Sequence, residues 1–330
     1  MAQIDRVLRS NIKLRHLQLV VALDQFRHIG RTADFLSVSQ PAVSKMLTEV
    51  EGMLGLALFD RSTRGTAPTA AGLSLIRFAR SVLAQYERTR DEISAVASGA
   101  AGRTRVGCMG GALPVLLSRG VALLKERSAR ATVLIEEGDL THLLPKLRIN
   151  ELDFFLGRLE PGYAAPDLVT EALYNEPMVA VVRRGHPLAR KTRPAWADLA
   201  RLPCIVPPPW ASLRVKIEQE FHRCGLEPPI DLIESSSYFA IATFAGQLDA
   251  VGFMARSVGR HFEREGLFKI LALDVGVELP PVGIITMRGQ RLTTSTQQLI
   301  ECLRAAVVEL FGPKGNIAAK AERPGRGRKK

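Results

Sequence analysis

The chain has 330 residues, 46% of them apolar, and carries a formal charge of +12 with an isoelectric point near 10.0. The length predicts about two domains, the apolar content is ample for conventional cores and excludes a mainly disordered chain, and the charge favours a polyanionic partner. No apolar stretch approaches membrane-spanning length and the first residues lack the apolar region of a signal peptide, so we expect a cytoplasmic protein with no membrane partner.

Two apolar sets near the N-terminus repeat at helical spacing on either side of a turn. The first runs from Leu14 to Phe26, and the second contains Ala33, Leu36, the turn residue Val38, Val43, Met46, Leu47 and Val50. Ser39 is placed to cap the second helix, and Pro41 is tolerated in its first turn. The pattern predicts two short helices joined by a tight turn, a shape that can push one helix into a DNA groove.

Polar side chains remain on the outer face of the second helix if its apolar set points inward. Amide, hydroxyl and ammonium groups at these positions can reach base edges and phosphates. An ordinary helical hairpin with a solvated polar face is the alternative that the pattern alone leaves open. The predicted DNA-contacting residues of this segment are Arg31, Ser39, Gln40, Pro41, Ala42, Ser44, Lys45 and Thr48.

A basic stretch from Arg61 to Thr69 follows, and it is interrupted by Gly65 and Pro68. Its flanks suit a short hairpin, which predicts the wing of a winged helix-turn-helix. A wing would place Arg61, Arg64 and Thr66 over phosphates or a minor groove and add affinity. An arginine-rich surface loop is the alternative.

The run from Leu14 to Ala71 resembles the N-terminal domain of LysR-type transcriptional regulators. The residues that carry the resemblance are Leu17, Ala33, Leu36, Ser39 to Ser44, Glu51, Leu54-Gly55, Leu58-Phe59, Arg61, Thr69 and Ala71-Gly72. The elements around His16, Gly65 and Pro68 look most like the subgroup of the galactose-binding-protein regulator and the protocatechuate (pca) operon regulator. The family often has two alanines where this chain has Thr32-Ala33, and we expect the threonine hydroxyl to bond to the preceding turn.

A proline-free segment from Thr69 to Ser98 carries apolar residues at alternating spacings of four and three. This seam repeats every seven residues, which favours a long helix that pairs with a second copy. Packing onto its own domain is the competing explanation. A dimer would read an interrupted inverted repeat, with one recognition helix per half-site. The predicted dimerisation residues are Leu75, Val82, Tyr86, Ile93 and Val96.

Strands and helices alternate beyond this helix, which predicts a mostly parallel α/β domain of two lobes with a cleft between them. The motifs Leu152-Asp153, Glu176-Pro177 and His186-Pro187-Leu188-Ala189 resemble the effector-binding half of the same family, which implies the fold of type 2 periplasmic solute-binding proteins. His186 taken alone is expected to be structural. The predicted domains are a DNA-binding domain (1–68), a linker helix (69–98), a hinge (99–103), an effector domain (104–312; lobe 1 at 104–175 and 282–312, lobe 2 at 176–281) and a disordered basic tail (313–330).

A ligand of such a domain is expected at the carboxyl ends of the strands. Arg158 could pair with a carboxylate, whereas Asp139 could accept hydrogen bonds from sugar hydroxyls, so these two residues point to different effectors. The sequence leaves a sugar and an organic or aromatic acid open. The predicted effector-binding residues are Gly110, Gly111, Ala112, Asp139, Arg158, Pro207, Pro208, Ser235 and Ser236.

The C-terminal tail from residue 312 to residue 330 holds seven Lys or Arg residues and one acidic residue, a net charge of +6. Such a segment has little to bury and is expected to be disordered. Two interpretations remain: non-specific DNA affinity through Arg326 and Arg328, or a solubilising role alone.

Catalysis and cofactor binding are not expected. Cys108, Cys204, Cys224 and Cys302 are too widely spaced for a metal site or a redox pair and read as reduced thiols, and the glycines around Gly107 lack the dinucleotide-binding spacing. The sequence therefore predicts a ligand-responsive transcriptional regulator without cofactor or metal. Its expected partners are double-stranded promoter DNA, a small-molecule effector, further copies in a dimer or tetramer, and RNA polymerase. A cytoplasmic solute-binding module without a transcriptional role is the alternative.

Overall fold

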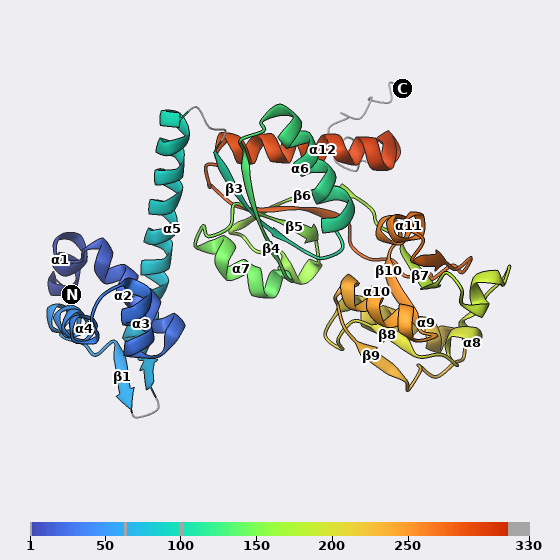
Figure 1. The fold of residues 1–330 in the computed structure, drawn as a ribbon, viewed down its shortest axis with the longest axis horizontal. Helices are drawn as coiled ribbons and strands as arrows, with labels where there is room; N and C mark the ends of the chain where they lie inside the picture. The colour runs from blue at the N-terminus through green and yellow to red at the C-terminus, as the bar shows by residue number, and fades with distance from the viewer. Residues whose placement is uncertain (1, 63–64, 99–101, 316–330) are drawn as a thin grey trace, which may run out of the picture. The chain divides into compact units, whose positions relative to one another are not determined.

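The computed structural model describes residues 2–62, 65–98 and 102–315 (Figure 1). The chain forms two compact units, and the long helix α5 belongs to the first of them. Within the described ranges, no helix combines the length and the apolarity that crossing a bilayer requires.

The N-terminal unit is a small helical domain with one β-hairpin. Its strands pair antiparallel, with Phe59 opposite Pro68 and Ser62 opposite Gly65. Apolar side chains from α2, α4 and α5 form its core, among them the fully buried Leu19, Leu23 and Leu47. The elements are α1 (Ala2–Ser10), α2 (Leu14–Phe26), α3 (Ile29–Leu36), α4 (Gln40–Leu54), β1 (Phe59–Ser62), β2 (Gly65–Pro68) and α5 (Ala70–Ser98).

The turn between α3 and α4 is built as the sequence predicts. Ser37 adopts a left-handed conformation (φ 54°) that ends α3, and the Ser39 hydroxyl accepts the N–H of Ala42 at 3.3 Å to cap α4. The Thr32 hydroxyl donates to the carbonyl of His28 at 2.9 Å, which confirms the expected bond to the preceding turn. Val38 differs from the expectation: it is 39% exposed and does not join the core.

The helix α5 departs from the predicted pairing seam in its first half. Leu75 and Ala79 are buried in the core of the N-terminal unit, and Val82 packs against the same core. Leu75 was predicted to be a dimerisation residue, but its side chain is only 7% exposed and is used by its own domain. The competing explanation, packing onto its own domain, therefore holds for this half of the helix.

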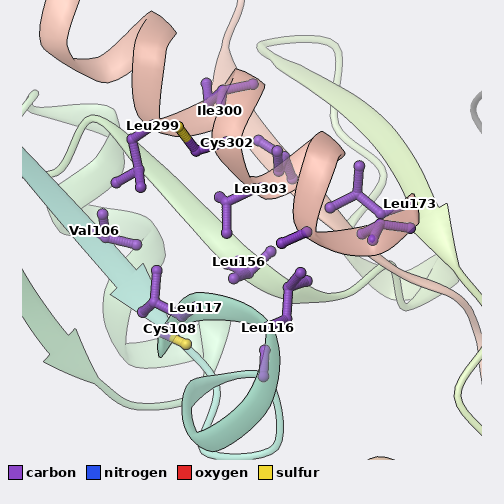
Figure 2. Packing of buried hydrophobic residues seen from close by; sticks show 14 of the residues in the cluster. Val106, Cys108, Leu116, Leu117, Leu156, Leu173, Leu299, Ile300, Cys302 and Leu303 are labelled. Atoms are coloured by element: carbon purple, nitrogen blue, oxygen red, sulfur yellow. The ribbon is translucent and has the colours of Figure 1, made fainter. Parts of the chain in front are cut away.

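Lobe 1 of the C-terminal unit is a five-stranded sheet in the order β4-β3-β5-β12-β6. Leu299 and Leu303 of α12 point towards Val106 and Leu156 on the strands in its main core (Figure 2). The backbone of α12 leaves the helical region at Gly312 (φ 70°), and most of the predicted basic tail lies outside the described residues. The elements are β3 (Arg103–Cys108), η1 (Leu113–Leu117), α6 (Ser118–Arg127), β4 (Thr132–Glu137), α7 (Leu140–Arg148), β5 (Phe154–Arg158), η2 (Pro161–Tyr163), β6 (Leu168–Tyr174), β12 (Val282–Met287) and α12 (Thr294–Gly315).

Lobe 2 is a second five-stranded sheet, in the order β11-β7-β10-β8-β9. Trp196 stacks at 5.9 Å on Phe253 and meets Phe221 edge-on at 4.7 Å in its core. His186 is structural, as expected, because its Nδ1 accepts the N–H of Leu188 at 3.0 Å. The elements are β7 (Met178–Arg183), η3 (Pro187–Arg190), α8 (Trp196–Leu199), β8 (Cys204–Val206), α9 (Ser212–Arg223), β9 (Leu232–Glu234), α10 (Tyr238–Gln247), β10 (Val251–Ala255), α11 (Arg256–Arg264) and β11 (Phe268–Ile270).

The two sheets are mixed, which corrects the expectation of a mostly parallel arrangement. In lobe 1, β3 pairs parallel with β4 and β5, whereas β12 pairs antiparallel with β5 and β6. In lobe 2, β8 pairs parallel with β9 and β10, whereas β7 pairs antiparallel with β10 and β11. The chain crosses between the lobes twice, from β6 to β7 and from β11 to β12. The two-lobed α/β fold is therefore confirmed.

Candidate nucleic-acid interface and effector site

The helix α4 divides into a buried face and a polar face. Val43, Leu47 and Val50 are fully buried, whereas Gln40 and Lys45 are exposed. Of the other residues predicted to contact DNA, Arg31, Ser39, Pro41 and Thr48 are exposed, and Ala42 and Ser44 are half-buried. The structure therefore brings these residues together on one outward surface around the start of α4.

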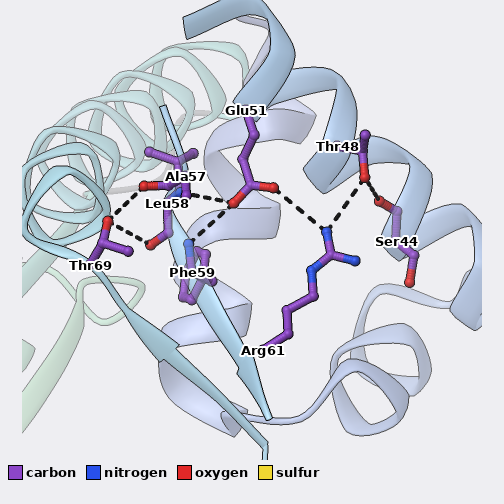
Figure 3. A network of polar contacts seen from close by, with 8 residues as sticks. All are labelled: Ser44, Thr48, Glu51, Ala57, Leu58, Phe59, Arg61 and Thr69. Atoms are coloured by element: carbon purple, nitrogen blue, oxygen red, sulfur yellow. Dashed lines mark hydrogen bonds and ion pairs between the residues drawn. The ribbon is translucent and has the colours of Figure 1, made fainter. Parts of the chain in front are cut away.

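The strand β1 is tied to this surface through Arg61 (Figure 3). The Nη2 atom of Arg61 lies 3.4 Å from the hydroxyl of Thr48 and 3.6 Å from a carboxylate oxygen of Glu51. The Thr48 hydroxyl in turn donates to the carbonyl of Ser44 at 3.0 Å. Recognition helix and hairpin thus present their cations and hydroxyls as one connected surface.

Two predicted hairpin contacts have different outcomes. Arg64 lies outside the described residues. Thr66 is only 7% exposed, and its N–H donates to the carbonyl of Arg27 at 2.9 Å, so the prediction that it contacts DNA is wrong for this structure. Side chains alternate across a strand, and the inward face of β2 falls on Thr66.

Glu51 connects α4 to the start of the hairpin, a structural role that the sequence does not predict. One oxygen of its carboxylate accepts the backbone N–H groups of Leu58 and Phe59 at 2.8 and 3.2 Å, and the other faces Arg61. The Glu51 side chain therefore ties the connection between α4 and β1 to α4, in addition to the burial of Leu58 and Phe59 in the core. A local signal existed, since Glu51 precedes a turn whose N–H groups need acceptors.

Replacing Glu51 with alanine is expected to weaken DNA binding by misplacing the hairpin. The change leaves two backbone N–H groups and Arg61 without their carboxylate, a loss on the order of 1–3 kcal/mol in stability. Thermal melting and a DNA titration of the variant measure both effects. Glu49→Ala, on the exposed side of the same helix, is the matched control, and equal behaviour of the two variants would contradict the positioning role.

The predicted effector-binding residues gather at one edge of each lobe. Gly110 and Asp139 follow the neighbouring strands β3 and β4, and Arg158 ends β5, the other neighbour of β3. In lobe 2, Pro207 follows β8 and Ser235 follows its parallel neighbour β9. Carboxyl ends of adjacent parallel strands meet at the same edge, so each group lies where a ligand is expected.

Side chains from the two lobes meet at these edges. A Cβ atom on Gly111 would lie 3.0 Å from the hydroxyl of Tyr238, at the start of α10 in the other lobe. The Ser212 hydroxyl, at the start of α9, donates to a carboxylate oxygen of Glu160 at 2.8 Å. Tyr238 was missed by the sequence reasoning, because nothing local connects it with the glycine turn.

Several predicted effector residues are buried or make hydrogen bonds within the protein. Ala112 is fully buried in the core of lobe 1, which corrects its assignment as a ligand contact. The Ser235 hydroxyl accepts the N–H of Ser237 at 3.1 Å, and the carbonyl of Pro208 accepts the N–H of Ala211 at 3.0 Å. The carbonyl of Pro207 accepts a hydrogen bond from Arg214 at 3.3 Å. Ser236 is exposed.

Asp139 caps the helix α7. Its carboxylate accepts the N–H of His142 at 3.0 Å and lies 2.9 Å from the Nδ1 atom of the same residue. Burial acts to raise the pKa of this carboxyl, but the hydrogen bonds with His142 hold the pKa below its usual value. This capping role explains Asp139 without a sugar ligand.

The cysteines behave as packing residues. Cys108, Cys204 and Cys302 are buried, Cys224 is exposed, and all are free thiols. Burial raises the pKa of Cys108 and of Cys204 to about 12, so both stay protonated and unreactive near neutral pH.

The sequence models of two known families match this chain. One is described as the LysR substrate binding domain and matches residues 97–308, and the other, the bacterial regulatory helix-turn-helix protein of the lysR family, matches residues 14–73. The chain belongs to the LysR family of transcriptional regulators. Its N-terminal unit is thus the DNA-binding part of a LysR regulator, and its two-lobed unit is the effector-binding domain.

Relatives and solved structures agree with this assignment. The HTH-type transcriptional regulator GbpR of Azospirillum brasilense is 32% identical over 302 residues, covering 91% of this chain and 88% of the relative. The regulator PcaQ of Agrobacterium fabrum is 29% identical over 303 residues, covering 92% and 97%. The crystal structure of CbnR, a LysR family transcriptional regulator, shares the fold with a TM-score of 0.68 at 19% identity, over 90% of this chain and 99% of that one.

Proposed function

We propose that this LysR-type regulator reads an interrupted inverted repeat in promoter DNA as a dimer or tetramer and changes its promoter contacts when a small metabolite binds between the lobes. The observation that carries the proposal is the continuous polar surface of α4 and β1, in which Gln40 and Lys45 are exposed and Arg61 is held beside Thr48. Amide and ammonium groups on an exposed helix suit base edges and phosphates in a major groove.

The second half of α5 supports the pairing of two copies. Tyr86, Ile93 and Val96 lie on this half and are 45%, 65% and 87% exposed. Apolar side chains at these exposures on a long helix favour burial against a second helix. In this proposal the second half of α5 forms the dimer interface. Val82 lies at the edge of that interface, and Leu75 is not part of it.

The switch is a shift between two arrangements of the effector domain. A ligand that binds one arrangement more tightly moves the population towards it, and a coupling of ~1–3 kcal/mol is enough for regulation. In this proposal the DNA-binding domain spans 1–68, the linker 69–98, the hinge 99–103 and the effector domain 104–312. The protein acts in the cytoplasm by binding rather than by catalysis, with RNA polymerase as its transcriptional partner.

A footprint of the full-length protein on the DNA upstream of its own gene tests the proposal. Two protected half-sites are expected, separated by one helical turn of about 10 base pairs or a multiple of it, because one recognition helix enters each. Repeating the footprint with candidate metabolites should change its extent. Uniform, sequence-independent protection at all salt concentrations would reject operator reading, and no protection at any concentration would favour a solute-binding module.

A further inference from the structure

The two charged residues at the edge of lobe 1, Asp139 and Arg158, differ in whether the structure provides them with an ionisable partner of opposite character. Asp139 is engaged in capping α7 through His142. Arg158, at the end of β5, is half-buried. Among the described residues, no carboxylate lies within 4.0 Å of its guanidinium nitrogens. The two residues that pointed to different effectors are therefore not equivalent, because Asp139 is engaged by His142 whereas Arg158 forms no close ion pair among the described residues.

The contacts of Arg158 place it where the chain crosses between the lobes. Its Nη1 atom donates to the carbonyl of Pro280 at 3.0 Å, just before β12, and its Nη2 atom lies 3.4 Å from the sulfur of Met178, at the start of β7. Burial lowers the pKa of this guanidinium, as expected for a cation moved out of water. These contacts orient the side chain but supply no negative charge.

The nearby carboxylates have other partners. Glu176 accepts the N–H and the hydroxyl of Ser257 at 3.0 and 2.8 Å, which holds it at the start of α11. Glu160 accepts the hydroxyl of Ser212. Burial raises the pKa of Glu176, and neither Glu176 nor Glu160 comes within the 4.0 Å of an ion pair with Arg158. A desolvated cation without a counter-ion is costly, and a bound anion removes that cost.

The other lobe covers this position with Tyr238. Its hydroxyl lies at the Gly111 turn, where a side chain would leave only 3.0 Å between a Cβ atom and the hydroxyl. The turn follows β3, the immediate neighbour of β5, so Arg158 and Tyr238 face the same edge from opposite lobes. A ligand held there contacts a guanidinium, a glycine turn and a phenol hydroxyl.

We propose that Arg158 anchors an anionic group of the effector, so that the effector is a small organic anion and not a neutral sugar. The inference rests on the proposed function only in that the lobes bind an effector. Carboxylates and phosphate esters share the required chemistry, because both accept paired hydrogen bonds from a guanidinium. Tyr238 supplies the second polar contact and closes the site from lobe 2.

Matched pairs of probes test the proposal with the full-length protein. The probes are benzoate against benzamide, and galactonate and galactose 1-phosphate against galactose, with melting temperature and tryptophan fluorescence as readouts. The chain has two tryptophans, of which Trp196 is buried and Trp210, in the loop before α9, is 82% exposed and can report on the site. A ligand that binds the folded state raises the melting temperature in proportion to its occupancy.

At least one anionic probe is expected to stabilise the protein at millimolar concentration while its neutral partner does not. Arg158→Gln should weaken that binding about 30-fold or more, which corresponds to about 2 kcal/mol. Arg190→Gln, an exposed arginine of lobe 2, is the control and should bind the probe normally. Comparison of the carboxylate probes with the phosphate probe shows which of the two anionic groups the site binds.

Three results would overturn the proposal: a neutral probe that binds as tightly as its anion, unchanged binding by Arg158→Gln, or no stabilisation by any anion in the panel. In each case the footprint of the same preparation on operator DNA separates the two conclusions. An intact footprint means that only the anion anchor is wrong, whereas its loss in the wild-type protein means that the regulator proposal itself has failed.

Discussion

Replacing Gln40, Ser44 and Lys45 together with alanine is expected to abolish operator discrimination while the protein stays folded. The three side chains lie on the outer face of α4, opposite Val43 and Leu47, and alanine favours the helix. Each base-edge contact contributes ~1–3 kcal/mol, so the specific affinity should fall at least ~100-fold. Loss of one phosphate contact should also reduce the slope of log K against log salt by about one.

Titrations with operator and with scrambled DNA at several salt concentrations measure both effects. Gln18→Ala, at an exposed position of α2, is the control and should keep the ratio of the two affinities. If the triple variant keeps that ratio, the polar face of α4 is not the reading surface. Circular dichroism and the melting temperature of the triple variant should match those of the wild type. A match excludes unfolding as the cause of the lost discrimination.

The largest loss of stability is expected from Gly72→Ala. Gly72 lies in the first turn of α5, where a Cβ atom would approach the carbonyl oxygen of Leu58 to 2.0 Å, a backbone atom that cannot rotate away. The same carbonyl accepts the N–H of Thr69 at 2.9 Å, and the Thr69 hydroxyl caps the helix by accepting the N–H of Gly72 at 3.1 Å. The variant must therefore move the whole start of α5.

Overpacking of this kind costs about 3 kcal/mol, which lowers the melting temperature of the N-terminal unit by roughly 12 to 24 °C. Gly52→Ala is the control, because Gly52 lies in α4 with no atom within 4 Å of the added carbon, and this change should stabilise the helix by ~0.5–1 kcal/mol. Calorimetry on both variants decides the matter. Similar melting temperatures would show that the start of α5 is not packed as described.

The sequence predicts the DNA-binding region well because its signals are local. The cap at Ser39, the hydroxyl of Thr32 and the burial of Val43 and Leu47 depend on neighbours within a few positions along the chain. Local signals failed where two elements compete for one side chain. Leu75 fits a pairing seam and a domain core equally well by spacing, and only the position of α2 beside α5 decides between them.

Strand order predicts where the candidate effector residues lie, but it does not predict their contacts. The predicted strand ends agree with the structure, in which Gly110 and Asp139 follow β3 and β4 and Arg158 ends β5. The cap that occupies Asp139 is visible in retrospect as a carboxylate three residues before His142. The absence of a close ion pair to Arg158 among the described residues and the approach of Tyr238 depend on long-range contacts, set by how the chain returns through Pro280 and how lobe 2 meets lobe 1.

The continuity of α5 has a mechanical consequence. Its first turns are part of the N-terminal core through Leu75 and Ala79, and the helix runs without interruption from Ala70 to Ser98, a length of about 43 Å at 1.5 Å per residue. The helix therefore acts as a stiff lever, and the DNA-binding domain is rigidly attached to one end of it. A tilt of about ten degrees at the far end would move the DNA-binding domain sideways by roughly 7 Å, which is about two base-pair rises along a duplex.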